Sequence, residues 1–170
     1  MKSTIALFSS ARRHGNTGRL MDLVAGRLNI EVVDLGEKRI AAYTYEHRNR
    51  HDDFEPLMGH VLRFEQIIFA SPIYWYATSP PMKMFLDRIS DYLDLAELLD
   101  EGRRLRGKAG YVLCTSVDDT PASAFIDSFR QTFEYLGMSF GGFVHVKCES
   151  GFVPETCEAD VAAFVELLRR

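Results

Sequence analysis

Residues 4–17 read TIALFSSARRHGNT, and this stretch decides the fold. Its first five residues are apolar and do not alternate with polar ones, as expected of a strand buried on both faces. Beyond the stretch, apolar residues recur at helical spacing, at Leu20, Leu23, Val24 and Leu28. The order strand, serine-rich turn, helix is typical of a parallel α/β fold, in which such a turn can hold a phosphate.

The turn at 9–17 has the parts of a phosphate site. Asn16 or Thr17 is expected to cap the helix, so that backbone N–H groups of its first turn face the turn unpaired. These donors, the helix dipole, two serine hydroxyls and Arg12 or Arg13 together suit a doubly charged monophosphate. The alternative is an ordinary helix cap beside solvated arginines. The loops after the third and fourth predicted strands bear on the choice between a phosphate site and a simple cap.

The composition is that of an ordinary globular protein. A length of 170 residues suits one domain over residues 1–170, with 46% hydrophobic and 26% charged residues. A net charge of −4 without a long basic run argues against a nucleic-acid partner, and no segment is long enough to span a membrane. The three cysteines form no C-x-x-C pair, which argues against zinc and iron–sulfur sites, and their odd number does not suggest a disulfide framework. We therefore expect a cytoplasmic protein without metal.

Strand-like and helical patterns alternate along the chain. Apolar runs at 4–9, 30–35, 66–70, 109–115 and 142–148 predict five strands. After the first helix, further helical patterns cover 54–64, a long segment from Ser79 to about 99, a segment from Thr120-Pro121 to Gly137, and about 155–168. This alternation predicts a parallel sheet with helices on both faces, and strand order 2-1-3-4-5 is the commonest at this size.

In that order, ligands bind outside the carboxyl ends of the strands, beside the first strand. The loop after the third strand reads SPIYWYAT (71–78) and carries three consecutive aromatic residues, including the single Trp. Exposed aromatic rings beside backbone polar groups suit a flat ligand, although they can also fill the gap between strand and helix. With phosphate favoured at one end and a planar ring at the other, the crevice has the shape of a flavin mononucleotide.

Two signatures resemble those of flavodoxin-like NAD(P)H-dependent FMN reductases. Residues 10–17, SARRHGNT, resemble that family's phosphate loop S-x-R-x-x-G-N-T. Residues 71–76, SPIYWY, followed by 82–88, MKMFLDR, resemble its second signature, S-P-x-Y-W-Y and then M-K-x-F-x-D-R. The similarity spans nearly the whole chain. It implies a flavodoxin-like three-layer α/β sandwich, FMN as cofactor, NADPH or NADH as co-substrate, and a homodimer.

The resemblance also implies which residues hold the cofactor. In the phosphate loop they are Ser10, Arg12, Gly15, Asn16 and Thr17; beside the isoalloxazine they are Pro72, Ile73, Tyr74 and Trp75, largely through their backbone; and Ser116 closes the third side. No catalytic side chain is expected, because the flavin carries the chemistry.

The chain departs from the family's pattern at two places. Ser9 stands where the family often has Gly. The loop 116–119 reads SVDD without glycine, so its backbone is expected to approach the ring less closely, and Asp118 to repel an anionic reduced flavin.

The implied function is hydride transfer from NAD(P)H to FMN and onward to a small acceptor: a quinone, a flavin, a nitro or azo compound, or a metal ion. The alternatives are a flavodoxin-type electron carrier without NAD(P)H turnover, and a non-catalytic flavodoxin-like domain. Such carriers usually surround the flavin with acidic residues. The reductase is favoured by arginines that would attract nucleotide phosphates, at positions 12, 13, 48 and 50.

The remaining charged residues carry no chemistry in this interpretation. Residues 36–53 are expected to be irregular, with His47, His51 and the neighbouring aspartates solvated and not ligating a metal. Asp87 and Arg88 are expected to form pairs at the helix surface or at an interface.

Overall fold

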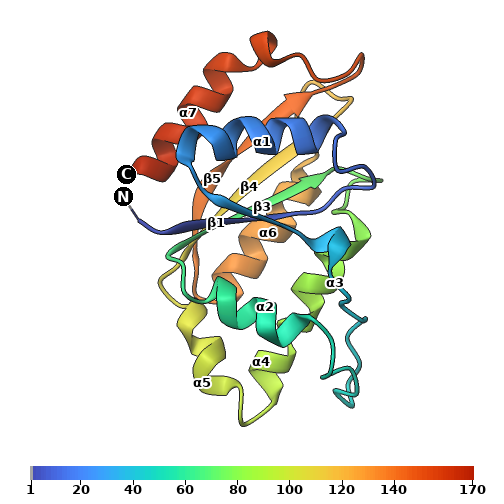
Figure 1. The fold of residues 1–170 in the computed structure, drawn as a ribbon, viewed down its shortest axis with the longest axis vertical. Coiled ribbons are helices and arrows are strands. Elements are labelled where there is room, and N and C mark those ends of the chain that lie inside the picture. The colour runs from blue at the N-terminus through green and yellow to red at the C-terminus, as the bar shows by residue number, and fades with distance from the viewer. Residues whose placement is uncertain (1) are drawn as a thin grey trace.

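The strands form one parallel sheet in the predicted order β2-β1-β3-β4-β5. The computed structural model describes residues 2–170. Central β1 (Thr4–Phe8) lies between β2 (Glu31–Asp34) and β3 (Gln66–Pro72), and β4 (Ala109–Ser116) and β5 (Ser139–Lys147) follow beyond β3 (Figure 1). The carboxyl ends of the strands therefore share one edge of the sheet, where the notable loops begin.

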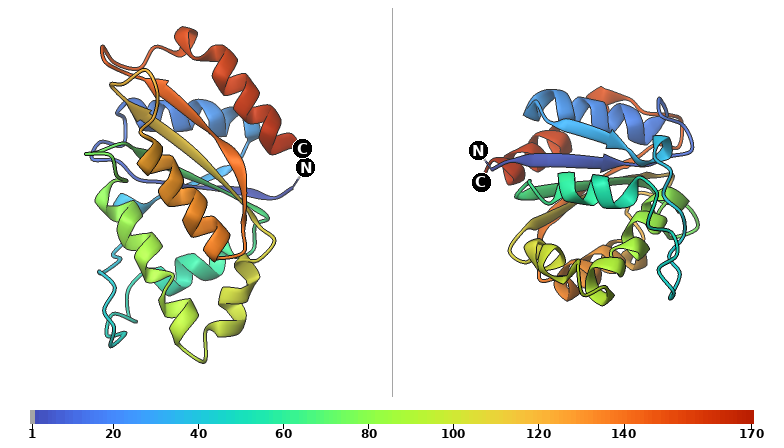
Figure 2. Two further views of the ribbon diagram at one scale, coloured as in Figure 1. Left: turned by 180° about the vertical axis from the view of Figure 1, so that it is seen from behind. Right: turned by 60° about the horizontal axis from the view of Figure 1, so that its bottom comes forward.

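Helices cover both faces of the sheet. α1 (Asn16–Leu28) and α7 (Glu158–Arg169) lie on one face, and α2 (Phe54–Val61), α3 (Pro80–Arg88) and α6 (Ser123–Tyr135) on the other (Figure 2). Residues 5–8 of β1 face the two layers alternately and are fully buried, which accounts for their unbroken apolar run. The shorter elements are α4 (Asp91–Asp94), α5 (Leu99–Gly102) and the 3-10 turns η1 (Leu35–Glu37), η2 (Arg103–Leu105) and η3 (Pro154–Thr156).

The predicted end of α6 is confirmed, but its predicted start is wrong. Gly137 has a left-handed φ of 73°, and the Met138 N–H donates to the Phe133 carbonyl over 2.8 Å, which closes the helix in a Schellman motif. At the other end Thr120 and Pro121 lie in the loop, because Ala122 is the N-cap and the helix begins at Ser123. The final helix likewise begins three residues later than predicted, at Glu158, after η3.

The predicted long helix from Ser79 to about 99 is also wrong. Ser79 is the N-cap of α3, as expected, but the helix ends at Arg88. The Ile89 and Ser90 amides bond to carbonyls only three residues back, and the chain then turns into the four-residue α4. The apolar spacing continues across this break because both segments pack their apolar side chains into the same layer.

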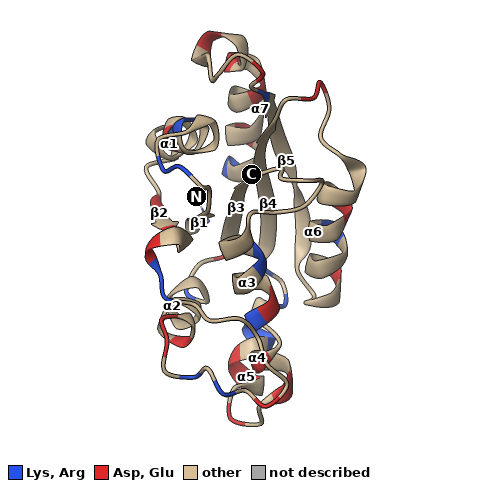
Figure 3. Cartoon of the chain, turned by 90° about the vertical axis from the view of Figure 1, so that its right-hand side faces the viewer, with Lys and Arg blue, Asp and Glu red and all other residues tan. Residues whose placement is uncertain are grey.

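The break brings Arg88 and Asp91 together in the interior. Arg88 is 1% exposed, and its Nε donates to Asp91 Oδ2 over 2.7 Å while Nη1 donates to Asp52 Oδ2 over 2.5 Å. It also donates to the carbonyls of Ala41 and Asn49, so one guanidinium holds the irregular segment 38–53 against α3. Figure 3 shows acidic and basic segments meeting around α3 and α4. The expectation of a surface pair is therefore wrong for Arg88.

The expectation that the charges at 47–53 are solvated is wrong for His47 and Asp52, whereas His51 is exposed as expected. His47 Nδ1 lies 2.7 Å from Oδ1 of the buried Asp91, and Asp52 is paired with Arg88. Within residues 2–170 no group of three or more His, Cys, Asp or Glu side chains is arranged to hold a metal ion. Among the same residues no helix has the length and apolarity needed to cross a bilayer.

Replacing Arg88 by Met should strongly destabilise the fold. The change leaves the carboxylates of Asp52 and Asp91 largely buried without their cation, a loss of about 3–5 kcal/mol in the free energy of unfolding. The matched control is Lys83→Met, in the same helix, which breaks an exposed pair with Asp87 worth about 1 kcal/mol or less. Urea denaturation measures both, and equal losses would contradict the assigned role of Arg88.

Candidate functional site

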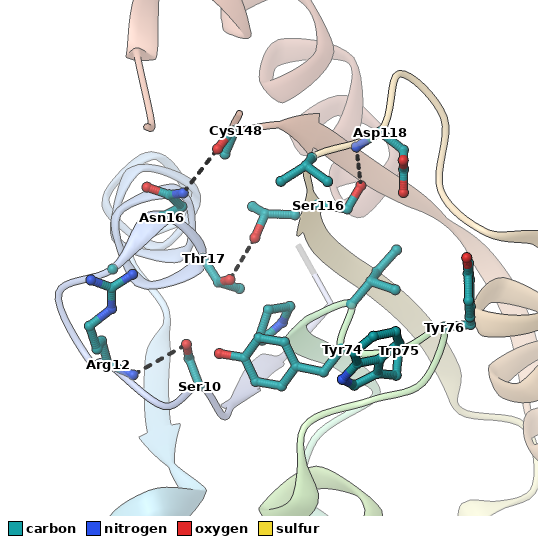
Figure 4. A pocket seen from close by; sticks show the side chains of 15 residues that line it. Ser10, Arg12, Asn16, Thr17, Tyr74, Trp75, Tyr76, Ser116, Asp118 and Cys148 are labelled. Carbon is teal, nitrogen blue, oxygen red and sulfur yellow. Dashed lines mark hydrogen bonds between the residues drawn. The ribbon is translucent and has the colours of Figure 1, made fainter. Parts of the chain in front are cut away.

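A pocket of about 450 Å³ opens at the carboxyl ends of β1, β3 and β4. All ten residues predicted to hold the cofactor line it, joined by Tyr76, Thr115, Val117, Asp118 and Cys148. Figure 4 shows Ser10, Arg12, Asn16 and Thr17 on the left of the pocket, the aromatic side chains at the lower right, and Ser116 and Asp118 at the upper right. The sheet topology thus brings the three loops together around one cavity.

The start of α1 leaves its first backbone donors free of any side-chain cap. Gly15 is the N-cap, so the predicted capping by Asn16 or Thr17 is wrong. The Asn16 amide instead links α1 to the segment after β5: Nδ2 donates to the Cys148 carbonyl over 3.4 Å, and Oδ1 accepts from the Phe152 N–H over 3.1 Å. The N–H groups of the first turn therefore remain available to an anion.

Of the two candidate arginines, only Arg12 lines the pocket. Arg13 makes two hydrogen bonds to the Asp22 carboxylate, of 2.6 and 3.1 Å, and these raise the pKa of its guanidinium. Within the described residues no acidic side chain pairs with Arg12. The Ser10 hydroxyl accepts from the Arg12 backbone N–H over 3.5 Å, so its own proton is free to be donated. One uncompensated cation thus stands beside the free helix donors.

Three buried serines, Ser9, Ser71 and Ser79, are joined by hydrogen bonds beneath the pocket. The Ser79 hydroxyl donates to Ser9 Oγ over 2.8 Å and accepts from Ser71 Oγ over 3.2 Å, while the Ser79 N–H donates to Ser71 Oγ over 2.9 Å. These bonds connect the ends of β1 and β3 with the start of α3. They also give Ser9, which replaces a glycine of the family pattern, a structural role under the pocket.

The aromatic loop forms a strained tight turn. Tyr74 and Ala77 exchange two backbone hydrogen bonds of 2.9 and 3.0 Å, and Trp75 and Tyr76 between them have left-handed φ values of 49° and 65°. This is the type I′ arrangement, in which residues other than Gly and Asn are disfavoured, here by about 1–2 kcal/mol each. Trp75 is 94% exposed and Tyr76 66%, so neither ring fills the gap between strand and helix. Strain of this kind often marks a binding site.

The third loop holds a polar pair that the sequence does not reveal. Ser116 Oγ lies 2.8 Å from His145 Nε2 and accepts from the Asp118 N–H over 3.1 Å. Burial lowers the pKa of His145, while the carboxylate of Asp118 acts in the opposite direction. His145 and Cys148 come from β5 and the segment after it, and only their register beside β4 could have signalled them. Burial keeps the pKa of the Cys148 thiol above its ordinary value.

The residues present fit FMN. The free N–H groups of α1, Arg12 and the Ser10 hydroxyl form a donor set for a phosphate, and the aromatic turn and Ser116 offer surfaces and polar groups for a planar ring. A cavity of this size is also within the range of small-molecule sites.

Comparisons with known proteins agree with this chemistry. The model of the NADPH-dependent FMN reductase family matches residues 3–146. YwqN of Bacillus subtilis (strain 168), whose name gives it an inferred role as an NAD(P)H-dependent FMN-containing oxidoreductase, is 33% identical over 95 residues. That match covers 55% of this chain and 52% of YwqN, so the chain spans about half the length of this curated relative.

Two solved structures share the fold over almost the full chain. The Trp repressor binding protein from Bacillus subtilis has a TM-score of 0.77 and 25% identity, with 98% of this chain and 97% of that one covered. An FMN-dependent NADH-azoreductase from Bacillus anthracis, solved in complex with FMN, has a TM-score of 0.72 and 12% identity, with 99% of both chains covered. At that identity the likeness to the azoreductase concerns the fold alone.

Gly18→Ala should disrupt the turn of the phosphate loop. A Cβ at Gly18 would lie 1.7 Å from the Arg13 carbonyl oxygen, so the turn before α1 must move, at a loss of about 1–3 kcal/mol in the free energy of unfolding. Gly26 of the same helix has no atom within 4 Å of such a Cβ, and Gly26→Ala should gain about 0.5–1 kcal/mol. Thermal unfolding of both variants tests this, and two shifts of the same sign would contradict it.

Proposed function

The chain belongs to the NADPH-dependent FMN reductase family, and we propose that it passes electrons from NAD(P)H through bound FMN to a small acceptor. The observation that carries the proposal is the pocket itself. Unpaired backbone N–H groups of α1 and Arg12 line one side of it, and the aromatic turn at 74–76 lines the other. The acceptor would be a quinone, a flavin, a nitro or azo compound, or a metal ion. Residues 1–170 would act as a single FMN-binding domain, and family likeness leads us to expect a homodimer.

The phosphate end would be held by charge and by oriented donors. The N–H groups of the first turn of α1 and the Arg12 guanidinium would bind the phosphate oxygens, with the Ser10 hydroxyl as a further donor. The Thr17 hydroxyl shares a 2.7 Å hydrogen bond with Thr115 in the interior, which fixes this side of the pocket to β4. Thr17 would then contribute chiefly through its backbone.

The ring end would be held by the backbone of 72–75 and by Ser116. FMN, when bound, supplies a ring system that takes a hydride from NAD(P)H and returns electrons to the acceptor. The exposed rings of Trp75 and Tyr76 stand at the mouth of the pocket, where they would stack on a flat partner. The Asp118 carboxylate, which also lines the pocket, would oppose added negative charge there.

The alternative of an electron carrier without NAD(P)H turnover stays open to experiment. Three of the four arginines expected to attract nucleotide phosphates already have acidic partners: Arg13 pairs with Asp22, Arg48 with Glu46, and Arg50 with Glu55 and Glu97. Surface charge therefore favours the reductase less than the sequence implies. Family membership favours the reductase over the carrier, because the pocket would hold FMN in either case.

Arg12→Ala should weaken FMN binding. Loss of a charge-assisted contact is worth about 1.5–3 kcal/mol, which corresponds to roughly a 10- to 150-fold rise in Kd. The matched control is Arg13→Ala, the neighbouring arginine that is bound to Asp22, and its Kd should stay within about threefold of the unmodified protein. Quenching of FMN fluorescence measures both. Equal effects would place the phosphate elsewhere, and no quenching at micromolar concentrations would remove the proposal.

Steady-state oxidation of NADPH and NADH separates the reductase from the carrier. We expect the FMN-loaded protein to oxidise one or both nucleotides in the presence of a quinone, with turnover that depends on added FMN. Bound FMN without any turnover would support the electron carrier, and failure to take up FMN at all would support the non-catalytic domain.

A further inference from the structure

His145 lies between the outer edge of the sheet and the candidate cofactor pocket. It lies on the edge strand β5, where its partner in register on β4 is Cys114. Its Nε2 lies 2.8 Å from Oγ of Ser116, a pocket residue, and its ring also lines two hollows on the outer side of β5. Within residues 2–170, Nδ1 of His145 has no hydrogen-bond partner. The imidazole thus stands between solvent and a hydroxyl of the pocket.

The hydrogen bonds of Ser116 make its hydroxyl depend on His145. A hydroxyl has one proton and two lone pairs, and the Asp118 N–H occupies one lone pair of Ser116 Oγ. When His145 is neutral with its proton on Nδ1, Nε2 accepts the Ser116 proton and the second lone pair of Ser116 Oγ faces the pocket as an acceptor. When His145 is an imidazolium, Nε2 donates to Ser116, and the Ser116 proton must turn toward the pocket as a donor.

Two opposing effects act on the pKa of His145, so that an added charge nearby would change its protonation. Burial disfavours the imidazolium, and Asp118 favours it. The other titratable groups that face the ring or its hollows are Asp119 of the β4–α6 loop, Lys147 of β5, Glu149 after it, Cys157 and Asp160 at the start of α7, and Cys114 of β4. Lys147 is paired with Asp119 and Glu149, and burial raises the pKa of Cys114 to about 12, so this thiol stays neutral. Negative charge added to the pocket would tip the balance toward the imidazolium.

We propose that His145 and Ser116 form a proton-responsive pair that offsets the charge of a reduced cofactor. Electrons from NAD(P)H add negative charge to the pocket; a proton from water then binds at His145, and Ser116 turns from acceptor to donor toward the cofactor. The proton returns to water when the electrons leave for the acceptor. His145 is therefore a positioning residue that acts through Ser116. The inference rests on the proposed function, because it requires FMN in the pocket.

The pH dependence of the midpoint potential of bound FMN tests the pair. In the range where His145 titrates, uptake of one extra proton per two electrons should steepen the slope by about 30 mV per pH unit. His145→Gln should lose this extra slope. Ser116→Ala keeps the imidazole but removes the hydroxyl that links it to the pocket. The pKa of His145 should then differ less between oxidised and reduced FMN, so the steeper slope should extend over a shorter pH interval. The matched control is His60→Gln, which changes a half-buried histidine of α2 paired with Glu31 on β2 and should keep the slope of the unmodified protein.

The outcomes separate this inference from the proposed function. Parallel pH profiles for the unmodified protein and His145→Gln would overturn the pair while leaving FMN binding intact. No FMN binding in the fluorescence titration would overturn both. If His145→Gln fails to fold, an NMR titration of the His145 ring in the unmodified protein decides: its pKa should be higher with reduced than with oxidised FMN, and equal values would overturn the pair.

Discussion

The hydroxyl network of Ser9, Ser71 and Ser79 is the interaction on which the candidate site depends. Parallel pairing places the ends of β1 and β3 at one edge of the sheet, but does not fix the loops that leave them. The buried hydrogen bonds among the three serines do so, because they tie both strand ends to the first turn of α3. Buried hydroxyls without partners would be costly, so the network favours a single arrangement of the loops.

The sequence predicts the sheet well because its signals are local. Unbroken apolar runs identify the strands, and chain order with right-handed crossovers then limits the topology. The same logic brings all ten predicted site residues to one pocket. The predictions fail where the environment of a side chain is set by a partner far away in the sequence. Asn16 looks like a helix cap but bonds to the segment after β5, and Arg88 looks like a surface residue but pairs with Asp52, 36 positions away.

The pocket concentrates features that a fold selected for stability alone would avoid. Trp75 and Tyr76 hold left-handed backbone angles with exposed rings, the start of α1 lacks a side-chain cap, and Arg12 has no acidic partner among the described residues. The first two features cost free energy in the isolated chain, and all three would be relieved or used by a ligand with an anionic end and a flat ring. His145 adds a titratable group behind the third loop, where reduction chemistry would make use of it.

A crystal structure of the protein grown with FMN tests the central claim most directly. We predict a phosphate within hydrogen-bond distance of the first-turn N–H groups of α1 and of Arg12, and an isoalloxazine between the turn at 73–76 and the loop at 115–118. An empty pocket at saturating FMN, or a nucleotide whose phosphate lies away from the start of α1, would contradict the account.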